Sequence, residues 1–164
     1  MGLRRIRIVV SRPKYVLAGK LFNIPVKGTH AHAFVSSFHN ADELKGLTMA
    51  VNKEIPDLKP PQKDFVSTCF HWQAQLAGSL KLLASESNDG EMVAFISYAI
   101  AFPHEFLALI DTYNVCKSGV LNFCSVALAL NDFGYKALGV RIDSGDLAYL
   151  STVVKTVFQQ LARR

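Results

Sequence analysis

The chain has 164 residues, half of them hydrophobic, so it is long enough to form one domain with a buried core. Its net charge is +5, but six of the 18 basic residues fall in the first 20 positions, and no nucleic-acid-binding signature accompanies them. Three cysteines match no metal or redox spacing, no apolar run could span a bilayer, and the basic start lacks the apolar stretch of a secretory signal. We therefore expect a cytoplasmic protein without nucleic-acid or membrane partners.

The first part of the chain is predicted to hold short elements: a strand over 6–10, a helix over 15–22, a strand over 24–27 and a helix over 33–38. Residues 1–14 form a basic N-terminal segment. Residues 39–61 contain three prolines and are predicted to be a surface loop insertion with one helical turn around 42–50. The remainder, from residue 15 to the end, is expected to form the main folded unit.

The second part is predicted to alternate longer helices with buried strands: helices over 62–84, 91–102, 118–131 and 146–164, and strands over 106–113 and 137–143. The two strands end at Asp111 and Asp143, about 30 residues apart with a helix between them, which is the length of a βαβ unit. The strands should therefore be parallel and adjacent or nearly so. This pattern predicts the α/β class.

Polar side chains follow three of the predicted strands, in the stretches Thr29 to His32, Asp111 to Tyr113 and Arg141 to Asp146. Ligands of α/β folds bind where the carboxyl ends of parallel strands meet. The two histidines are candidates for proton transfer, phosphoryl transfer or metal binding; the alternative is that one or both only pack or cap. Arg141 and Asp143 share one strand face and could bind a ligand or form a structural ion pair, while Ser144 and Asp146 also suit a helix N-cap.

Four separated motifs make the chain resemble the nicotinate phosphoribosyltransferases. They are Leu17-Ala-Gly, Gly28-Thr-His-Ala-His32, Asp111-Thr-Tyr-Asn-Val with Ser118-Gly119, and Gly139-Val-Arg-Ile-Asp-Ser-Gly-Asp-Leu147. The resemblance covers most of residues 15–158 and implies part of an irregular TIM-like α/β barrel of the type II phosphoribosyltransferase kind over 15–164, in an enzyme that works as a homodimer. The implied reaction converts nicotinate and 5-phosphoribosyl 1-pyrophosphate to nicotinate mononucleotide and pyrophosphate, coupled to ATP hydrolysis, in NAD biosynthesis.

The resemblance also implies roles for individual residues. His32 matches the catalytic histidine that ATP transiently phosphorylates, and Thr29 and Arg141 match residues that contact nicotinate. Asp143 matches a carboxylate near the ribose hydroxyls of the phosphoribosyl donor, and Arg4 resembles an arginine near its phosphate end. Asp111 and Ser144 are expected at the same substrate site. ATP is the coupled substrate and Mg²⁺ is expected to come with the donor, so no metal-ligand set is assigned to the chain.

The chain departs from the family pattern at both ends. Met1 stands where the family has an aromatic residue, residues 6–15 lack a glycine-rich stretch with an aspartate, and the sequence stops before the later barrel strands. We therefore expect a fragment, a truncated isoform or an imperfect gene model of a longer enzyme. Two alternatives remain: a catalytically incomplete product that acts only as an interaction fragment, and a metal-dependent amidohydrolase with His30 and His32 as ligands.

Overall fold

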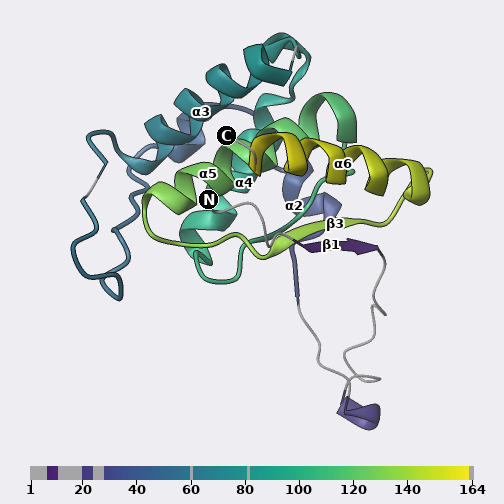
Figure 1. Ribbon diagram of the computed structural model, residues 1–164, viewed down its shortest axis with the longest axis horizontal. Helices are drawn as coiled ribbons and strands as arrows, with labels where there is room; N and C mark the ends of the chain where they lie inside the picture. The colour runs from purple at the N-terminus through teal and green to yellow at the C-terminus, as the bar shows by residue number, and fades with distance from the viewer. Residues whose placement is uncertain (1–6, 11–19, 24–27, 60, 81, 163–164) are drawn as a thin grey trace.

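The computed structural model describes residues 7–10, 20–23, 28–59, 61–80 and 82–162 (Figure 1). The predicted strand over 24–27, most of the helix over 15–22, and Arg4 lie outside these residues. The described strands are β1 (Arg7–Val10), β2 (Leu107–Leu109) and β3 (Gly139–Ile142). The helices are α2 (His32–Ser36), α3 (Phe65–Leu80), α4 (Asp89–Ala101), α5 (Val120–Asp132) and α6 (Leu147–Ala162), with short helical turns η2 (Ala41–Leu44), η3 (Ala84–Glu86) and η4 (Val115–Gly119).

The three described strands form one parallel sheet in the order β1-β3-β2. Leu109 pairs with Arg141, which pairs on its other side with Val9. The α/β class and the parallel, adjacent placement of β2 and β3 are therefore confirmed. The backbone contact continues beyond the strand ends, because the Ile110 N–H donates to the Arg141 carbonyl oxygen at 3.1 Å.

The two faces of the sheet have different roles because side chains alternate along a strand. Ala108, Ile110, Val140 and Ile142 belong to the hydrophobic core, against which Ile8 also packs. Leu109 and Asp111 on β2 and its continuation, and Arg141 and Asp143 on β3 and its continuation, occupy the other set of alternating positions. The polar strand ends are thereby directed away from the main apolar core.

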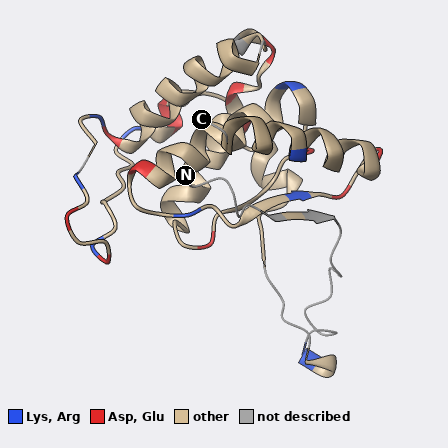
Figure 2. Cartoon of the chain, in the orientation of Figure 1, with Lys and Arg blue, Asp and Glu red and all other residues tan. Residues whose placement is uncertain are grey.

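Helix α5 connects β2 to β3 and forms the centre of the helical layer. Nearly all of its residues are buried, and it packs against both α3 and α4. Figure 1 shows α3 to α6 gathered on one side of the strands, with α6 crossing near β1 and β3. Lys, Arg, Asp and Glu residues concentrate in the loops and near helix ends, whereas the middle of α5 contains none (Figure 2). The apolar sequence of α5 is thus explained by burial on all sides.

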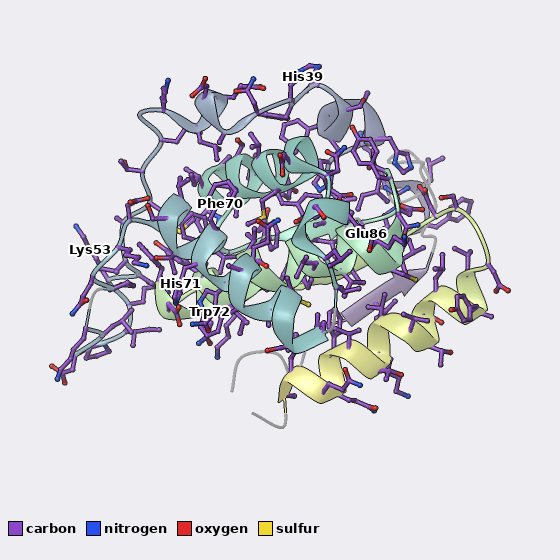
Figure 3. All side chains as sticks on the ribbon, turned by 90° about the horizontal axis from the view of Figure 1, so that it is seen from above. His39, Lys53, Phe70, His71, Trp72 and Glu86 are labelled. Carbon is purple, nitrogen blue, oxygen red and sulfur yellow. The ribbon has the colours of Figure 1, made fainter. Side chains whose placement is uncertain are left out.

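The predicted surface insertion over 39–61 contains only the short turn η2 among its described residues, in the region where one helical turn was expected. Asn40 caps this turn by accepting from the Asp42 N–H at 2.9 Å. The loop then returns to the end of α5, where the Asn52 N–H donates to the Phe133 carbonyl oxygen at 2.9 Å. Figure 3 shows Lys53 on this loop, at the left of the view and to the side of Phe70 and His71 of α3.

Several element boundaries differ from the sequence prediction. Helix α4 begins at Asp89, two residues earlier than expected, because the Asn88 side chain accepts the Glu91 N–H at 2.8 Å and caps the helix. Helix α3 is shorter than the predicted 62–84. Strand β2 is also shorter than the apolar run that predicted it, since the chain turns at Asp111 into the site.

Cys69, Cys116 and Cys124 are all free, and Cys69 and Cys124 are buried. Burial raises the pKa of the Cys124 thiol well above its usual range, so this residue packs as an apolar side chain. Within the described ranges, none of the helices has the length and apolar character required to cross a bilayer.

Candidate active site

His32 is the first residue of α2 and lies between two polar groups from distant parts of the chain. Its Nδ1 is 3.0 Å from the Thr112 hydroxyl, and its Nε2 is 3.1 Å from Oδ1 of Asp143. An ionised carboxylate can only accept hydrogen bonds, so this arrangement favours the tautomer with a proton on Nε2 and an accepting lone pair on Nδ1. The side chain is 44% exposed and can be reached by a ligand.

Asp143 holds both His32 and Arg141. Its Oδ2 accepts a hydrogen bond from Nη2 of Arg141, two residues earlier on the same strand face. The structural ion pair expected as one possibility for these residues is therefore present. A guanidinium carries five N–H donors, so pairing through one Nη2 hydrogen is compatible with binding a second anion.

Asp111 connects the end of β2 to the loop after β3 through hydrogen bonds. Its Oδ2 accepts hydrogen bonds from the Asp143 N–H at 2.8 Å, the Ser144 N–H at 2.7 Å and the Ser144 hydroxyl at 2.7 Å. Its Oδ1 is buried and has no hydrogen-bond partner among the described residues. Ser144 thus donates hydrogen bonds to the Asp111 carboxylate, whereas Asp146 caps α6 by accepting a hydrogen bond from the Tyr149 N–H at 3.0 Å.

The loop that carries His32 is attached by two side chains to the edge of β2 opposite β3. The Thr29 hydroxyl donates to the Leu107 carbonyl oxygen, and the Leu109 N–H donates to Nε2 of His30 at 3.2 Å. Backbone groups that would otherwise pair with another strand are thereby satisfied by side chains. Thr29 and His30 set the position from which His32 enters the site.

His30 and His32 differ sharply in environment although only one residue separates them. His30 is 7% exposed, and its ring lies within 5.5 Å, centroid to centroid, of the rings of Phe34, Phe95 and Tyr98. Burial is the main reason that its pKa is lowered to about 4, with smaller contributions from His32 and Arg141. His30 is therefore neutral at pH 7, and its Nε2 already accepts a backbone N–H.

The side chains of His32, Asp111 and Asp143 could together hold a cation. One ligand atom from each lies within 4.8 Å of the others. Carboxylate oxygens suit Mg²⁺, and the unpartnered Oδ1 of Asp111 is a free acceptor in this group. His30 is not part of the group, so the pairing of two histidines on one metal, as the amidohydrolase alternative requires, has no support in this geometry.

The structure brings together five of the residues singled out in the sequence, namely His32, Asp111, Arg141, Asp143 and Ser144, and it places Thr29 against Leu107 at the start of β2. Sequence reasoning assigned no role to Thr112, although it follows Asp111 in a quoted motif, and its contact with His32 depends on folding across 80 positions. It also missed Glu91, which is wholly buried near the turn after Asp111. The only sequence signal for Glu91 was a carboxylate next to a strongly apolar helical stretch.

Comparison with known proteins confirms the resemblance. The chain is 55% identical over 151 residues to nicotinate phosphoribosyltransferase 1 of Arabidopsis thaliana and 42% identical over 147 residues to the human nicotinate phosphoribosyltransferase. These alignments cover 90% of this chain but only 26% and 27% of the relatives. The chain thus spans about a quarter of the length of the curated relatives it matches.

The fold comparison agrees with the sequence comparison. The crystal structure of human nicotinic acid phosphoribosyltransferase matches with a TM-score of 0.78 and 41% identity, over 91% of this chain and 29% of that one. No family model matches the chain.

Proposed function

We propose that this chain carries a nicotinate phosphoribosyltransferase site, which joins nicotinate to 5-phosphoribosyl 1-pyrophosphate and couples the reaction to ATP hydrolysis. The products are nicotinate mononucleotide, pyrophosphate, ADP and phosphate, and the reaction feeds NAD biosynthesis. The observation that carries the proposal is the position of His32 between Thr112 and Asp143 in a chain whose relatives bear this name. An exposed imidazole held by a carboxylate is a suitable phosphoryl acceptor.

In the proposed phosphoryl step, the lone pair on Nδ1 of His32 attacks the γ-phosphorus of ATP. A nitrogen–phosphorus bond forms, the bond from the γ-phosphorus to the bridging oxygen breaks, and ADP leaves with that electron pair. The ring becomes positively charged, and Asp143, which is bonded to Nε2, stabilises that charge. Thr112 must turn its hydroxyl away from Nδ1 before the attack, because the two groups are 3.0 Å apart.

Arg141 and Thr29 are proposed to contact nicotinate. The guanidinium of Arg141 suits the nicotinate carboxylate, and its existing bond to Asp143 fixes its position. The Thr29 hydroxyl already donates to Leu107, so Thr29 would contact the ligand through its methyl group or as a hydrogen-bond acceptor. Asp143 would lie near the ribose hydroxyls, where its charge favours the cation that develops as pyrophosphate leaves.

Asp111 and Asp143 would provide oxygen ligands for a Mg²⁺ ion that arrives with the phosphoribosyl donor. Such an ion would neutralise charge on the departing pyrophosphate. We further propose that the parallel sheet belongs to a TIM-like barrel and that the working enzyme is a cytoplasmic homodimer. The likeness to the human crystal structure over 91% of this chain supports the barrel.

The test is incubation of the chain with ATP labelled in its γ-phosphate, followed by mass spectrometry at neutral pH, because phosphohistidine is labile in acid. We expect label on His32 and none in His32→Asn. His39→Asn is the matched control, since His39 has a side chain that is 77% exposed and projects from the loop after α2 (Figure 3). Label that survives in His32→Asn, or no label on the unmodified chain, would overturn the phosphohistidine proposal. Formation of nicotinate mononucleotide from nicotinate and the donor tests the complete reaction.

A further inference from the structure

A buried carboxyl group lies next to the turn that follows the site residues of β2. Glu91, in the first turn of α4, is 0% exposed. Its Oε2 accepts hydrogen bonds from the Ser118 hydroxyl at 2.5 Å and from the Asn122 side-chain amide at 3.1 Å. The Asn122 amide also donates to Ser118, and the Asn88 N–H donates to the Ser118 hydroxyl oxygen at 2.9 Å. Glu91 therefore joins α4, α5 and the turn η4.

A carboxyl group at this depth requires a specific explanation, because burial of an unpaired charge is costly. Among the described residues no lysine or arginine pairs with Glu91; the nearby Lys117 pairs with Glu86 instead. Burial, with a smaller effect from Asp111, raises the pKa of Glu91 to about 7, although the bonds from Ser118 and Asn122 act in the opposite direction. The Oε1 atom is buried without a described partner. Apolar packing alone would be served better by leucine.

The turn that Glu91 holds is connected directly to the end of β2. The N–H groups of Ser118 and Gly119 both donate to the Asn114 carbonyl oxygen, at 2.9 and 3.0 Å. Gly119 lies close against Ile110, the residue that follows β2: a Cβ atom added at Gly119 would lie 2.1 Å from the carbonyl oxygen of Ile110. Ser118 is thus fixed by Glu91 on one side, while its neighbour touches the residue that precedes Asp111 on the other.

The site residues come immediately after this contact. Asp111 accepts three hydrogen bonds from Asp143 and Ser144, and Thr112 contacts His32. A shift of the η4 turn would therefore move both of the groups that fix His32, namely Thr112 directly and Asp143 through Asp111.

We propose that Glu91 is a positioning residue of the active site, which acts through Ser118 on the turn after β2 and so holds Asp111 and Thr112 in register with His32. The inference deepens the proposed function and rests on it for the activity readout alone. Glutamine has the shape of a protonated glutamate and can accept the same two hydrogen bonds, whereas leucine fills the space and accepts none. The two substitutions therefore separate hydrogen bonding from packing.

The experiment compares Glu91→Gln and Glu91→Leu with the unmodified chain, and uses Asp89→Asn as the control, since Asp89 is an exposed acid in the same turn of α4. Hydrogen exchange of the Asp143 and Ser144 amides reports on the Asp111 contacts directly. We expect Glu91→Leu to speed exchange at these two amides by about tenfold more than at amides in the middle of α3, and Glu91→Gln and Asp89→Asn to leave it near the unmodified rate. Labelling of His32 by ATP should be slower in Glu91→Leu, and close to the unmodified rate in Glu91→Gln and Asp89→Asn.

Equal acceleration at α3 and at the two site amides would mean that Glu91 serves general stability, and would overturn the proposal. Loss of protection in Glu91→Gln as large as in Glu91→Leu would overturn it as well. If Glu91→Leu does not fold, Ser118→Ala removes the same link more mildly and should give the same local pattern. Failure of the unmodified chain to label would count against the proposed phosphoryl transfer, while the exchange rates would still decide the role of Glu91.

Discussion

Nε2 of His32 and Oδ1 of Asp143 lie 3.1 Å apart, although 111 positions separate the two residues in the chain. The other oxygen of the same carboxylate pairs with Arg141. One carboxylate therefore orients the proposed phosphoryl acceptor and the proposed nicotinate-binding cation together, so their positions are linked before any ligand arrives.

Replacement of Asp143 by asparagine should lower the rate of ATP-dependent labelling of His32 by about 10- to 100-fold, because a neutral amide stabilises the charged imidazole poorly and can favour the wrong tautomer. Single-turnover labelling with ATP would measure the rate. Asp146→Asn is the matched control, since asparagine also caps helices and Asp146 serves α6. An unchanged labelling rate in Asp143→Asn would remove Asp143 from the mechanism.

Arg141→Ala should weaken nicotinate binding by about 2 to 4 kcal/mol, because the ligand carboxylate would lose a charge-assisted hydrogen bond in a largely buried site. Calorimetric titration with nicotinate would measure the loss. Nicotinamide, which lacks the carboxylate charge, is the comparison ligand and should show a smaller change. Equal nicotinate affinity in the two proteins would contradict the assignment of Arg141.

His30 and Glu91 should give opposite pH dependences of stability. The pKa of His30 is lowered from 6.5 to about 4, so its contribution is present above pH 6.5 and is lost as the pH falls toward 4. The pKa of Glu91 is raised from 4.5 to about 7, so its contribution is present below pH 4.5 and is lost as the pH rises toward 7. Each group changes the free energy of unfolding by about 3 kcal/mol over its range. The two changes have opposite signs, so they largely cancel in the chain that carries both groups.

Single substitutions should reveal how His30 and Glu91 each change the free energy of unfolding with pH. As the pH falls below 6.5, the free energy of unfolding should decrease less in His30→Gln than in the unmodified chain. As the pH rises from 4.5 to 7, it should decrease less in Glu91→Gln than in the unmodified chain. Urea unfolding at closely spaced pH values provides the free energies. Stability differences that do not vary with pH would show that these two groups titrate normally in the folded chain.

Gly119→Ala should destabilise the chain by about 1 to 3 kcal/mol or more, because the new methyl group meets the Ile110 backbone, which cannot rotate away. Gly78→Ala on α3 is the matched control: nothing lies within 4 Å of its added Cβ, and alanine favours the helix by about 0.5 to 1 kcal/mol. Thermal unfolding of both variants checks the opposite signs. A neutral Gly119→Ala would mean that η4 is free to move away from β2.

The sequence predicts the relation between β2 and β3 because the apolar runs, their polar ends and the connecting helix are all local features. The partner of β1 was beyond such reasoning. A strand was expected over 6–10, but its pairing with β3 is a contact between positions more than 130 residues apart. The short length of β2 was also missed, since an apolar run does not reveal where the backbone turns.

The two histidines show where pattern reasoning ends. They occupy alternate positions in one motif, yet His30 is enclosed by Phe95 and Tyr98 of α4 whereas His32 is open to solvent. Which imidazole is buried depends on the packing of α4, more than 60 residues away. For Glu91 the limitation is the same, because an acidic residue near a helix start is usually solvated and only tertiary packing encloses this one.

The attachment of Thr29 and His30 to β2 also bears on self-association. An exposed strand edge with free N–H and carbonyl groups is a template for pairing with another chain. Here the side chains of Thr29 and His30 form hydrogen bonds with the Leu107 carbonyl oxygen and the Leu109 N–H, so the loop that positions His32 also shields this edge. Displacement of that loop would open a row of backbone groups to neighbouring molecules, and damage to the site would then be seen as aggregation as well as lost activity.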